Sequence, residues 1–166
     1  MAGNQETTEE LKDIMQYDEA HYFKIGSEIV LGGVITEMTE NSNPTESEKQ
    51  YIHQKSKTTK VTGFSNEFPI TMDMVKGDKV FEYMYKLFYE RKTGSDLNIE
   101  HYIVNLWEPI TDQAGSYKAR KITQTCSISE CNGGAGEQKQ ITGSLKGGDF
   151  VYGTFAVATK TFTENV

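Results

Sequence analysis

The sequence contains no segment that could cross a membrane as a helix. No run approaches the roughly 20 apolar residues that such a helix needs, and the N-terminus lacks the basic start and apolar core of a secretory signal peptide. We therefore expect no membrane partner and a protein made in the cytoplasm. At 166 residues, the chain has the length of one domain that buries its own core.

Cysteine is nearly absent, since Cys126 and Cys131 are the only two. They are five positions apart in the sequence, so on a regular strand their side chains would point to opposite faces of the sheet. This spacing favours two ordinary small strand residues over a disulfide or a pair of metal ligands.

Histidine is also scarce. His21, His53 and His101 lie in separate segments, and none has the spacing of a metal site or a nucleophile triad. Glu19 near His21 and Glu100 beside His101 are acidic neighbours, but chance accounts for such pairs. We predict no catalytic residue, no cofactor and no metal ion, and we expect that the protein is not an enzyme. Carboxylate pairs that meet only in the fold stay open.

A phosphate-binding loop is missing as well. The glycine-rich stretch 132–136 is followed by a predicted strand, without the Lys-Ser/Thr pair and the helix that bind phosphate. The stretch therefore predicts a turn between two strands.

Basic side chains are outnumbered, 17 against 24 acidic ones, which gives a net charge of −7. Much of the excess lies in residues 1–20, where Lys12 is the only basic residue. Nucleic-acid readers bind phosphates with Lys and Arg, so an acidic chain is a poor candidate for one. Thr7 and Glu10 fit a helix capping box, and for residues 1–20 both a short helix and a frayed acidic arm remain open.

Alternation of apolar and polar residues is the dominant pattern in the rest of the chain. It predicts strands over 21–25, 28–38 with a bend at Gly32-Gly33, 61–74, 97–107 and 117–130. Pro69 cannot donate to a ladder, which argues for an edge position or a break in the third strand. Residues 39–60 nearly lack apolar side chains and predict a long polar loop, a candidate contact surface.

Near the C-terminus, residues 141–162 hold two alternating runs joined by Gly147-Gly148, which predicts a β-hairpin. In that hairpin Leu145 would face Phe150 across the two strands. Both faces of the predicted hairpin carry apolar side chains, so both need cover.

One helix is predicted, over residues 79–91, with Asp78 as its N-cap and Arg91 near its negative end. Its apolar arc is wide for a surface helix. Two interpretations stay open: a helix buried in its own domain, or one shared with a neighbouring subunit. Together these segments predict a mainly β fold, one domain over residues 21–166 with a single flanking helix.

The order of these parts resembles the tail tube proteins, or major tail proteins, of long-tailed bacteriophages, especially those of Gram-positive hosts. Three stretches carry the resemblance, which covers residues 20–163: TGFSNEFPITMDM (62–74), KGDKVFEYMYKLF (76–88) and ITGSLKGGDFVYGTF (141–155).

The resemblance implies an antiparallel β-sandwich or half-barrel that self-assembles into hexameric rings. The rings would stack into the hollow tail tube, the conduit for DNA ejection. Expected partners are other copies of the chain, the tape measure, terminator and distal tail proteins, and phage DNA that passes without sequence-specific binding. The expected location is the virion, after synthesis in the host cytoplasm.

Two sets of residues are assigned within this picture. The expected assembly interface comprises Phe81, Tyr85, Phe88, Pro44, Tyr51 and Ile52. The expected lumen lining comprises Thr123, Thr125, Ser127, Thr142 and Ser144. Two other functions stay open: a tube protein of a bacterial contractile injection or secretion apparatus, and a monomeric carbohydrate-binding module that uses Trp107 as a stacking platform.

Overall fold

The computed structural model describes residues 11–166. The predicted capping box of Thr7 and Glu10 lies outside the described residues. Residues 11–15 have no regular secondary structure, and a single 3-10 turn, η1 (Gln16–Asp18), follows them.

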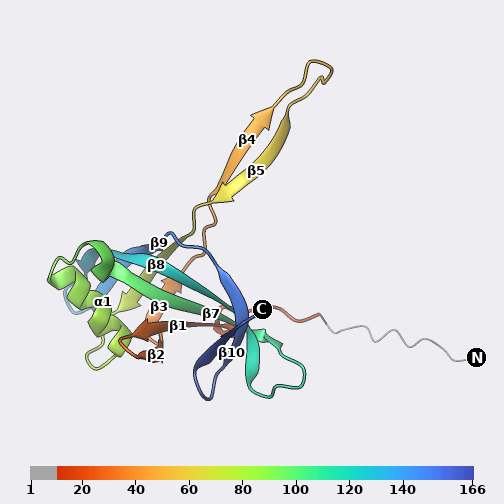
Figure 1. The fold of residues 1–166 in the computed structure, drawn as a ribbon. Coiled ribbons are helices and arrows are strands. Elements are labelled where there is room, and N and C mark those ends of the chain that lie inside the picture. The colour runs from red at the N-terminus through yellow and green to blue at the C-terminus, as the bar shows by residue number, and fades with distance from the viewer. Residues whose placement is uncertain (1–10) are drawn as a thin grey trace, which may run out of the picture.

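Most of the chain forms one antiparallel sheet of nine strands. The strands are β1 (Glu19–Ile25), β2 (Glu28–Leu31), β3 (Ile35–Met38), β6 (Glu67–Asp73), β7 (Asn98–Pro109), β8 (Ser116–Asn132), β9 (Gln140–Lys146), β10 (Val151–Ala156) and β11 (Thr161–Glu164). Their order is β2-β1-β7-β8-β9-β6-β3, and β10 and β11 branch from β8. The sheet curls into a half-barrel (Figure 1), which confirms the predicted fold class.

The predicted strand over 28–38 is two strands, β2 and β3. They are consecutive in the chain but lie at the two ends of the strand order. Gly32 follows the last residue of β2, and its N–H donates a hydrogen bond to the His21 carbonyl on β1. A Cβ at this position would collide with the Ile35 side chain. Only a curled sheet lets so short a connection join its two ends.

The predicted strand over 61–74 also breaks in two, at residues 65–66. Its second half, β6, lies between β9 and β3. The Pro69 carbonyl accepts a hydrogen bond from the backbone N–H of Thr39, which lies just past the end of β3. The Pro69 nitrogen, which has no hydrogen to donate, faces the same side, where the pairing of β6 with β3 has already ended.

The predicted C-terminal hairpin is wrong. Strands β9 and β10 do not pair with each other, because each pairs with a different part of β8. Strand β9 pairs with residues 125–132 of β8, and β10 pairs with residues 116–121. Leu145 therefore lies opposite Cys126 and not opposite Phe150. Gly147 and Gly148, with φ of 83° and 82°, kink the chain between two successive partners of one long strand.

The predicted long polar loop over 39–60 is wrong as well. It contains β4 (Pro44–Lys49), which pairs with β5 (Thr58–Phe64) in a separate two-stranded sheet. We call residues 44–64 the arm, because they project from the half-barrel (Figure 1). A strand without a buried face needs no apolar alternation, so its sequence does not show the usual signal.

The predicted helix is confirmed as α1 (Lys79–Tyr89). The Asp78 side chain accepts from the backbone of Phe81, and the chain turns at Arg91, where φ is 51°. The helix covers one face of the sheet and forms with it the first core. That core contains Phe23, Phe68, Ile70, Met72, Val80, Phe81, Met84, Leu87, Ile99, Ile103, Cys126, Ile141 and Leu145.

A second core lies on the opposite face of β1, β7 and β8. It contains Tyr22, Tyr102, Val104, Ala119 and Phe155. Strands β10 and β11 supply its cover, since Phe162 packs against it from β11. The C-terminal strands thus have apolar residues on two faces because the half-barrel has two cores.

Both cysteines contact the first core, contrary to the expectation of opposite faces. A β-bulge between Ile128 and Glu130 shifts the register of β8 by one residue, which returns Cys131 to the side of Cys126. Both thiols are free. Burial raises the pKa of the Cys126 thiol to about 12, so it remains protonated and unreactive.

Candidate assembly surfaces

The five residues assigned to a lumen lining lie on one face of β8 and β9. Thr123, Thr125 and Ser127 are exposed on β8, and Ser144 lies directly opposite Ser127. Thr142 and Ser144 are half-buried on β9. This face points away from the first core, because Gln124, Cys126 and Leu145 alternate with these residues and point into the protein.

Charged side chains on this hydroxyl face are largely paired. Lys146 lies 3.4 Å from Glu67, which also accepts a hydrogen bond of 3.2 Å from the Ser144 hydroxyl. Lys24 lies 3.5 Å from Glu100 on the neighbouring strands. Lys121 and Glu130, on the same face of β8, take part in no ion pair among the described residues. The face therefore offers short hydroxyl groups between mostly paired charges, and β8 and β9 present there no cluster of unpaired basic groups that would hold a phosphate chain.

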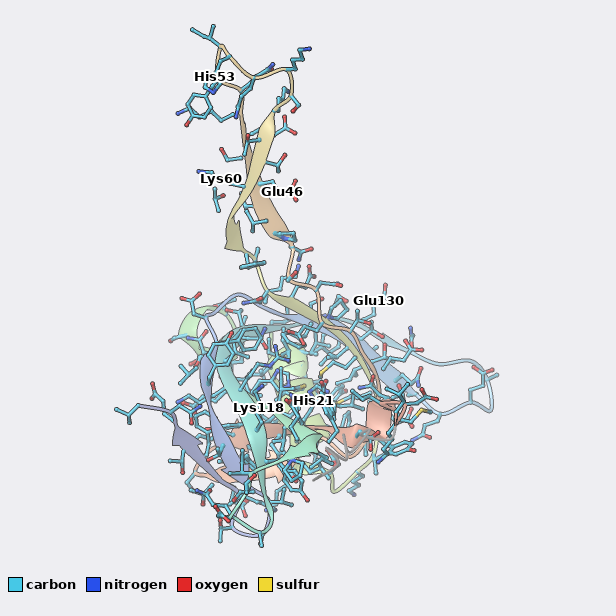
Figure 2. All side chains as sticks on the ribbon, turned by 90° about the vertical axis from the view of Figure 1, so that its right-hand side faces the viewer. His21, Glu46, His53, Lys60, Lys118 and Glu130 are labelled. Atoms are coloured by element: carbon cyan, nitrogen blue, oxygen red, sulfur yellow. The ribbon has the colours of Figure 1, made fainter. Side chains whose placement is uncertain are left out.

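The arm is the second candidate surface. All six residues of β4 are exposed, and in β5 only Gly63 is half-buried. Of the assigned interface residues, Pro44 lies at the base of the arm, opposite Phe64, and Tyr51 and Ile52 lie at its tip. Tyr51 stacks on His53, which lies at the tip of the arm (Figure 2), and Ile52 is fully exposed.

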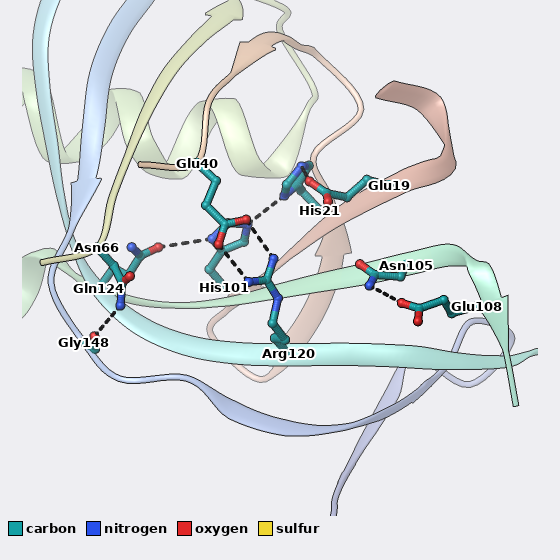
Figure 3. Close-up of polar contacts among 10 residues, drawn as sticks. All are labelled: Glu19, His21, Glu40, Asn66, His101, Asn105, Glu108, Arg120, Gln124 and Gly148. Carbon is teal, nitrogen blue, oxygen red and sulfur yellow. Dashed lines mark hydrogen bonds and ion pairs between the residues drawn. The ribbon is translucent and has the colours of Figure 1, made fainter. Parts of the chain in front are cut away.

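Polar contacts fix the base of the arm to the half-barrel. The backbones of Asn41 and Glu67 exchange two hydrogen bonds, of 2.8 and 2.9 Å. Arg120 on β8 forms two charge-assisted hydrogen bonds with Glu40, of 2.7 and 2.8 Å (Figure 3). The Arg120 guanidinium also lies over the Phe150 ring. A cavity of about 490 Å³ lies beside this ion pair. Arg120 therefore connects the half-barrel to the segment that leads into the arm.

Helix α1 divides its predicted interface residues between the interior and the surface. Phe81 is buried in the first core, and Tyr85 and Phe88 are half-buried and pack against each other. Tyr89, at the end of the helix, is 72% exposed. The wide apolar arc is thus used mainly within the chain, and its remaining exposed part lies around Tyr89.

The sequence did not indicate the polar chain that crosses the first core. Gln124 donates to the Leu145 carbonyl at 3.3 Å, so its amide oxygen accepts from His101 Nδ1 at 3.1 Å. His101 Nε2 then accepts from His21 Nδ1 at 3.0 Å (Figure 3). The other nitrogen of His21 lies 3.0 Å from Glu19 Oε1, although it is not aligned for a hydrogen bond. The only sequence signal was that Glu19 and His21, two apart, share a face of β1.

Burial determines the protonation state of His101 within this series of hydrogen-bonded side chains. Complete burial, aided by the nearby His21, lowers the pKa of His101 to about 3, so His101 is neutral near pH 7. The His21 imidazole holds the pKa of Glu19 below its usual range, although partial burial opposes the shift. The aromatic rings of Phe23 and Phe68 enclose His101. Both ring nitrogens of His101 and the amide of Gln124 have hydrogen-bond partners inside a packed core, which indicates a structural role.

A cavity of about 620 Å³ lies between β1 and the segment from β2 to β3. Glu19 and His21 contribute polar atoms to its wall, and Leu31, Ile35 and Met38 contribute apolar ones. No group of three or more His, Cys, Asp or Glu residues within 11–166 could hold a metal ion. Over the same residues, no helix has the length and apolar character needed to cross a membrane.

Comparison with known proteins gives structural matches only. No protein-family model and no curated protein matches the chain. The structure is similar to the SPP1 tail tube, solved by solid-state NMR and cryo-EM, with a TM-score of 0.66 at 15% identity over 84% of this chain and 78% of the other.

Two further matches are more distant in sequence. The tail of an empty GTA particle, refined with C6 symmetry, gives a TM-score of 0.57 at 9% identity over 84% of this chain and 98% of the other. The six-fold symmetrised baseplate of the anti-feeding prophage (AFP) gives 0.51 at 5% identity over 86% and 97%. The curled sheet with its one flanking helix is thus a fold that this chain has in common with components of phage tails and related particles.

Proposed function

We propose that this chain is a structural tail tube protein, which self-assembles into rings of six that stack into a hollow tube. The observation that carries the proposal is the arm, a two-stranded sheet whose two faces are both uncovered. An isolated hairpin of this kind is only marginally stable in water and gains stability when a partner covers it. The shared fold with the SPP1 tail tube supports another copy of the chain as that partner.

Six-fold symmetry is part of the proposal. The tail of the GTA particle was refined with C6 symmetry, and the AFP baseplate is six-fold symmetrised. In a cyclic ring every subunit offers the same two different surfaces to its neighbours, so one chain builds a closed wall. The arm then contributes to contacts between copies, and other tail proteins cap the two ends of the stack.

The hydroxyl face of β8 and β9 is proposed as the channel wall. A channel for DNA must not hold the phosphate backbone, and unpaired Lys or Arg would do so. Thr123, Thr125 and Ser127 supply polar groups that water can solvate, and Lys146 is neutralised by Glu67. The net charge of −7 adds repulsion between wall and DNA. DNA thus passes without sequence-specific binding during ejection from the virion.

The test is the assembly state of the purified protein. Light scattering after size-exclusion chromatography, over a range of concentrations, should show a shift from monomer to a six-subunit species or longer stacks. Negative-stain electron microscopy should then show rings or tubes on the order of 100 Å across, the size expected for six packed domains. A strict monomer at high concentration whose spectra shift on adding sugars would overturn the proposal and support a carbohydrate-binding module.

A second candidate is a tube or baseplate protein of a contractile injection apparatus. The structural match to the AFP baseplate favours this second candidate, because the match covers 86% of this chain. Both candidates predict rings of this chain. A contractile apparatus additionally needs a sheath, so electron microscopy of the native particle, with identification of a sheath protein around the tube, distinguishes it from a tail tube without a sheath.

A further inference from the structure

The two faces of the arm carry charges of opposite sign. Cross-strand partners share a face, and successive residues alternate between faces. Glu46 lies opposite Val61 and Glu48 opposite Thr59, and we call these four residues the acidic face. Ser47 lies opposite Lys60 and Lys49 opposite Thr58, and these four form the basic face. Glu46 and Lys60 extend to opposite sides of the arm (Figure 2).

Most of these charges have no partner within the chain. Glu48 is paired with Lys57 at 2.9 Å. Among residues 11–166, Glu46 and Lys60 take part in no ion pair, and Lys49 lies over the ring of Tyr51 without a carboxylate beside it. Val61, on the acidic face, is 53% exposed. The arm thus has an apolar side chain to cover and charges to neutralise.

We propose that the acidic face of one arm lies against the basic face of the arm of an adjacent copy. The inference rests on the proposed function, because a ring places two neighbours on opposite sides of every subunit. The contact joins two different surfaces of one chain, as rotation around a ring requires. A two-fold contact between identical faces would oppose Glu46 to Glu46 or Lys60 to Lys60, and like charges at an interface are unfavourable.

This contact also explains why the arm is polar yet protrudes from the protein. Complementary charges direct the encounter of two surfaces and fix their register, while they keep the separate subunits soluble. The contact should weaken as salt is added, since the Debye length is about 8 Å at physiological ionic strength.

Charge reversal tests the inference. In the acidic-face variant, Glu46→Lys and Glu48→Lys make both faces of the arm basic. In the basic-face variant, Lys49→Glu and Lys60→Glu make both faces acidic. Each variant alone should need a protein concentration at least about tenfold higher than wild type to form rings, because adjacent arms then repel. Glu48→Gln is the matched control, since it removes the ion pair with Lys57 without reversing the face.

Two rescue experiments make the test specific. The two variants mixed in equal amounts should assemble together, because a basic arm can alternate with an acidic one around a ring of even number. A chain with all four substitutions exchanges the two faces and should assemble alone. Analytical ultracentrifugation measures the assembly, and thermal melting checks that each half-barrel is folded.

The outcomes separate the inference from the proposed function. Wild-type protein that forms no rings contradicts the function itself. Wild-type rings together with single-face variants that assemble equally well overturn the inference alone. The same holds if both variants fail and neither the mixture nor the four-substitution chain restores assembly, because the arm faces then contact another surface.

Discussion

His101 is a titratable group that the fold holds uncharged. It is fully buried between Phe23 and Phe68, and its two ring nitrogens bond to His21 and Gln124. Its partner His21 lies 80 residues away in the chain, and no local pattern could have predicted that contact. The sequence shows only which residues are neighbours along the chain, so it indicates the Glu19–His21 pair and gives no sign of the contacts to His101 and Gln124.

The buried His101 predicts acid sensitivity of the fold. Its pKa in the folded protein, about 3, lies below the ordinary value of 6.5, so the unfolded chain takes up the proton first as the pH falls. The stabilising effect is complete above pH 6.5 and decreases as the pH falls toward 3. Well below pH 6.5, one group of this kind removes about 1.4 kcal/mol of the free energy of unfolding per pH unit, and the loss between pH 6.5 and 4.5 is about 2 kcal/mol.

Urea denaturation of wild type and His101→Gln at several pH values measures this effect. Gln keeps a donor and an acceptor but does not titrate, so its free energy of unfolding should vary less over this range. Glu19, whose pKa is lowered by His21, adds a loss of stability at still lower pH in both proteins. Equal slopes for the two proteins between pH 6.5 and 4.5 would contradict a neutral His101.

At the scale of the elements, local sequence signals correctly predicted the features that neighbouring residues determine, such as the type of an element and the start of the helix. The alternation of β7 and β8 and the Asp78 cap of α1 gave correct elements. The pair Gly147-Gly148 does not form the predicted hairpin turn, because a glycine pair shows that the chain bends and not which strand the next segment pairs with. Strand pairing depends on β8, whose 17 residues are long enough to bind β9 and β10 in succession.

Helix α1 allows a matched comparison between its buried and exposed aromatic residues. Phe81→Ser removes a ring from the first core and should reduce the free energy of unfolding by about 3 kcal/mol or more. Tyr89→Ser should leave the stability of the monomer within about 0.5 kcal/mol, because the Tyr89 side chain is largely exposed. If α1 is shared between subunits, Tyr89→Ser should nevertheless weaken ring formation.

Thermal melting and analytical ultracentrifugation on the same samples distinguish the two effects. Tyr89→Ser with normal melting and normal assembly would assign α1 entirely to the core of its own chain. That result would leave the predicted interface to the arm residues.

At the scale of the whole molecule, the half-barrel and the arm are separable in their packing. Neither core includes a residue of the arm, and β4 and β5 pair only with each other. The sequence predicted a mainly β fold because its strands alternate, while the half-barrel followed only from the resemblance to tail tube proteins. It predicted a contact surface at residues 39–60 because apolar residues are missing there. It could not predict that this surface is a sheet, since neither of its faces is buried in the chain.

This separation predicts that the arm can be removed without loss of the fold. Replacing residues 42–65 with Asn-Gly would join Asn41 to Asn66 by a short turn, and Asn41 and Glu67 already exchange two backbone hydrogen bonds there. The shortened chain keeps every residue of both cores and the Arg120–Glu40 ion pair. Its melting temperature should therefore remain close to that of wild type, because the free energy of unfolding comes mainly from core burial. Ring formation should be lost, because the proposed contact surface is absent. Calorimetry and electron microscopy of the two proteins measure both properties, and a shortened chain that still forms rings would place the assembly contacts on the half-barrel alone.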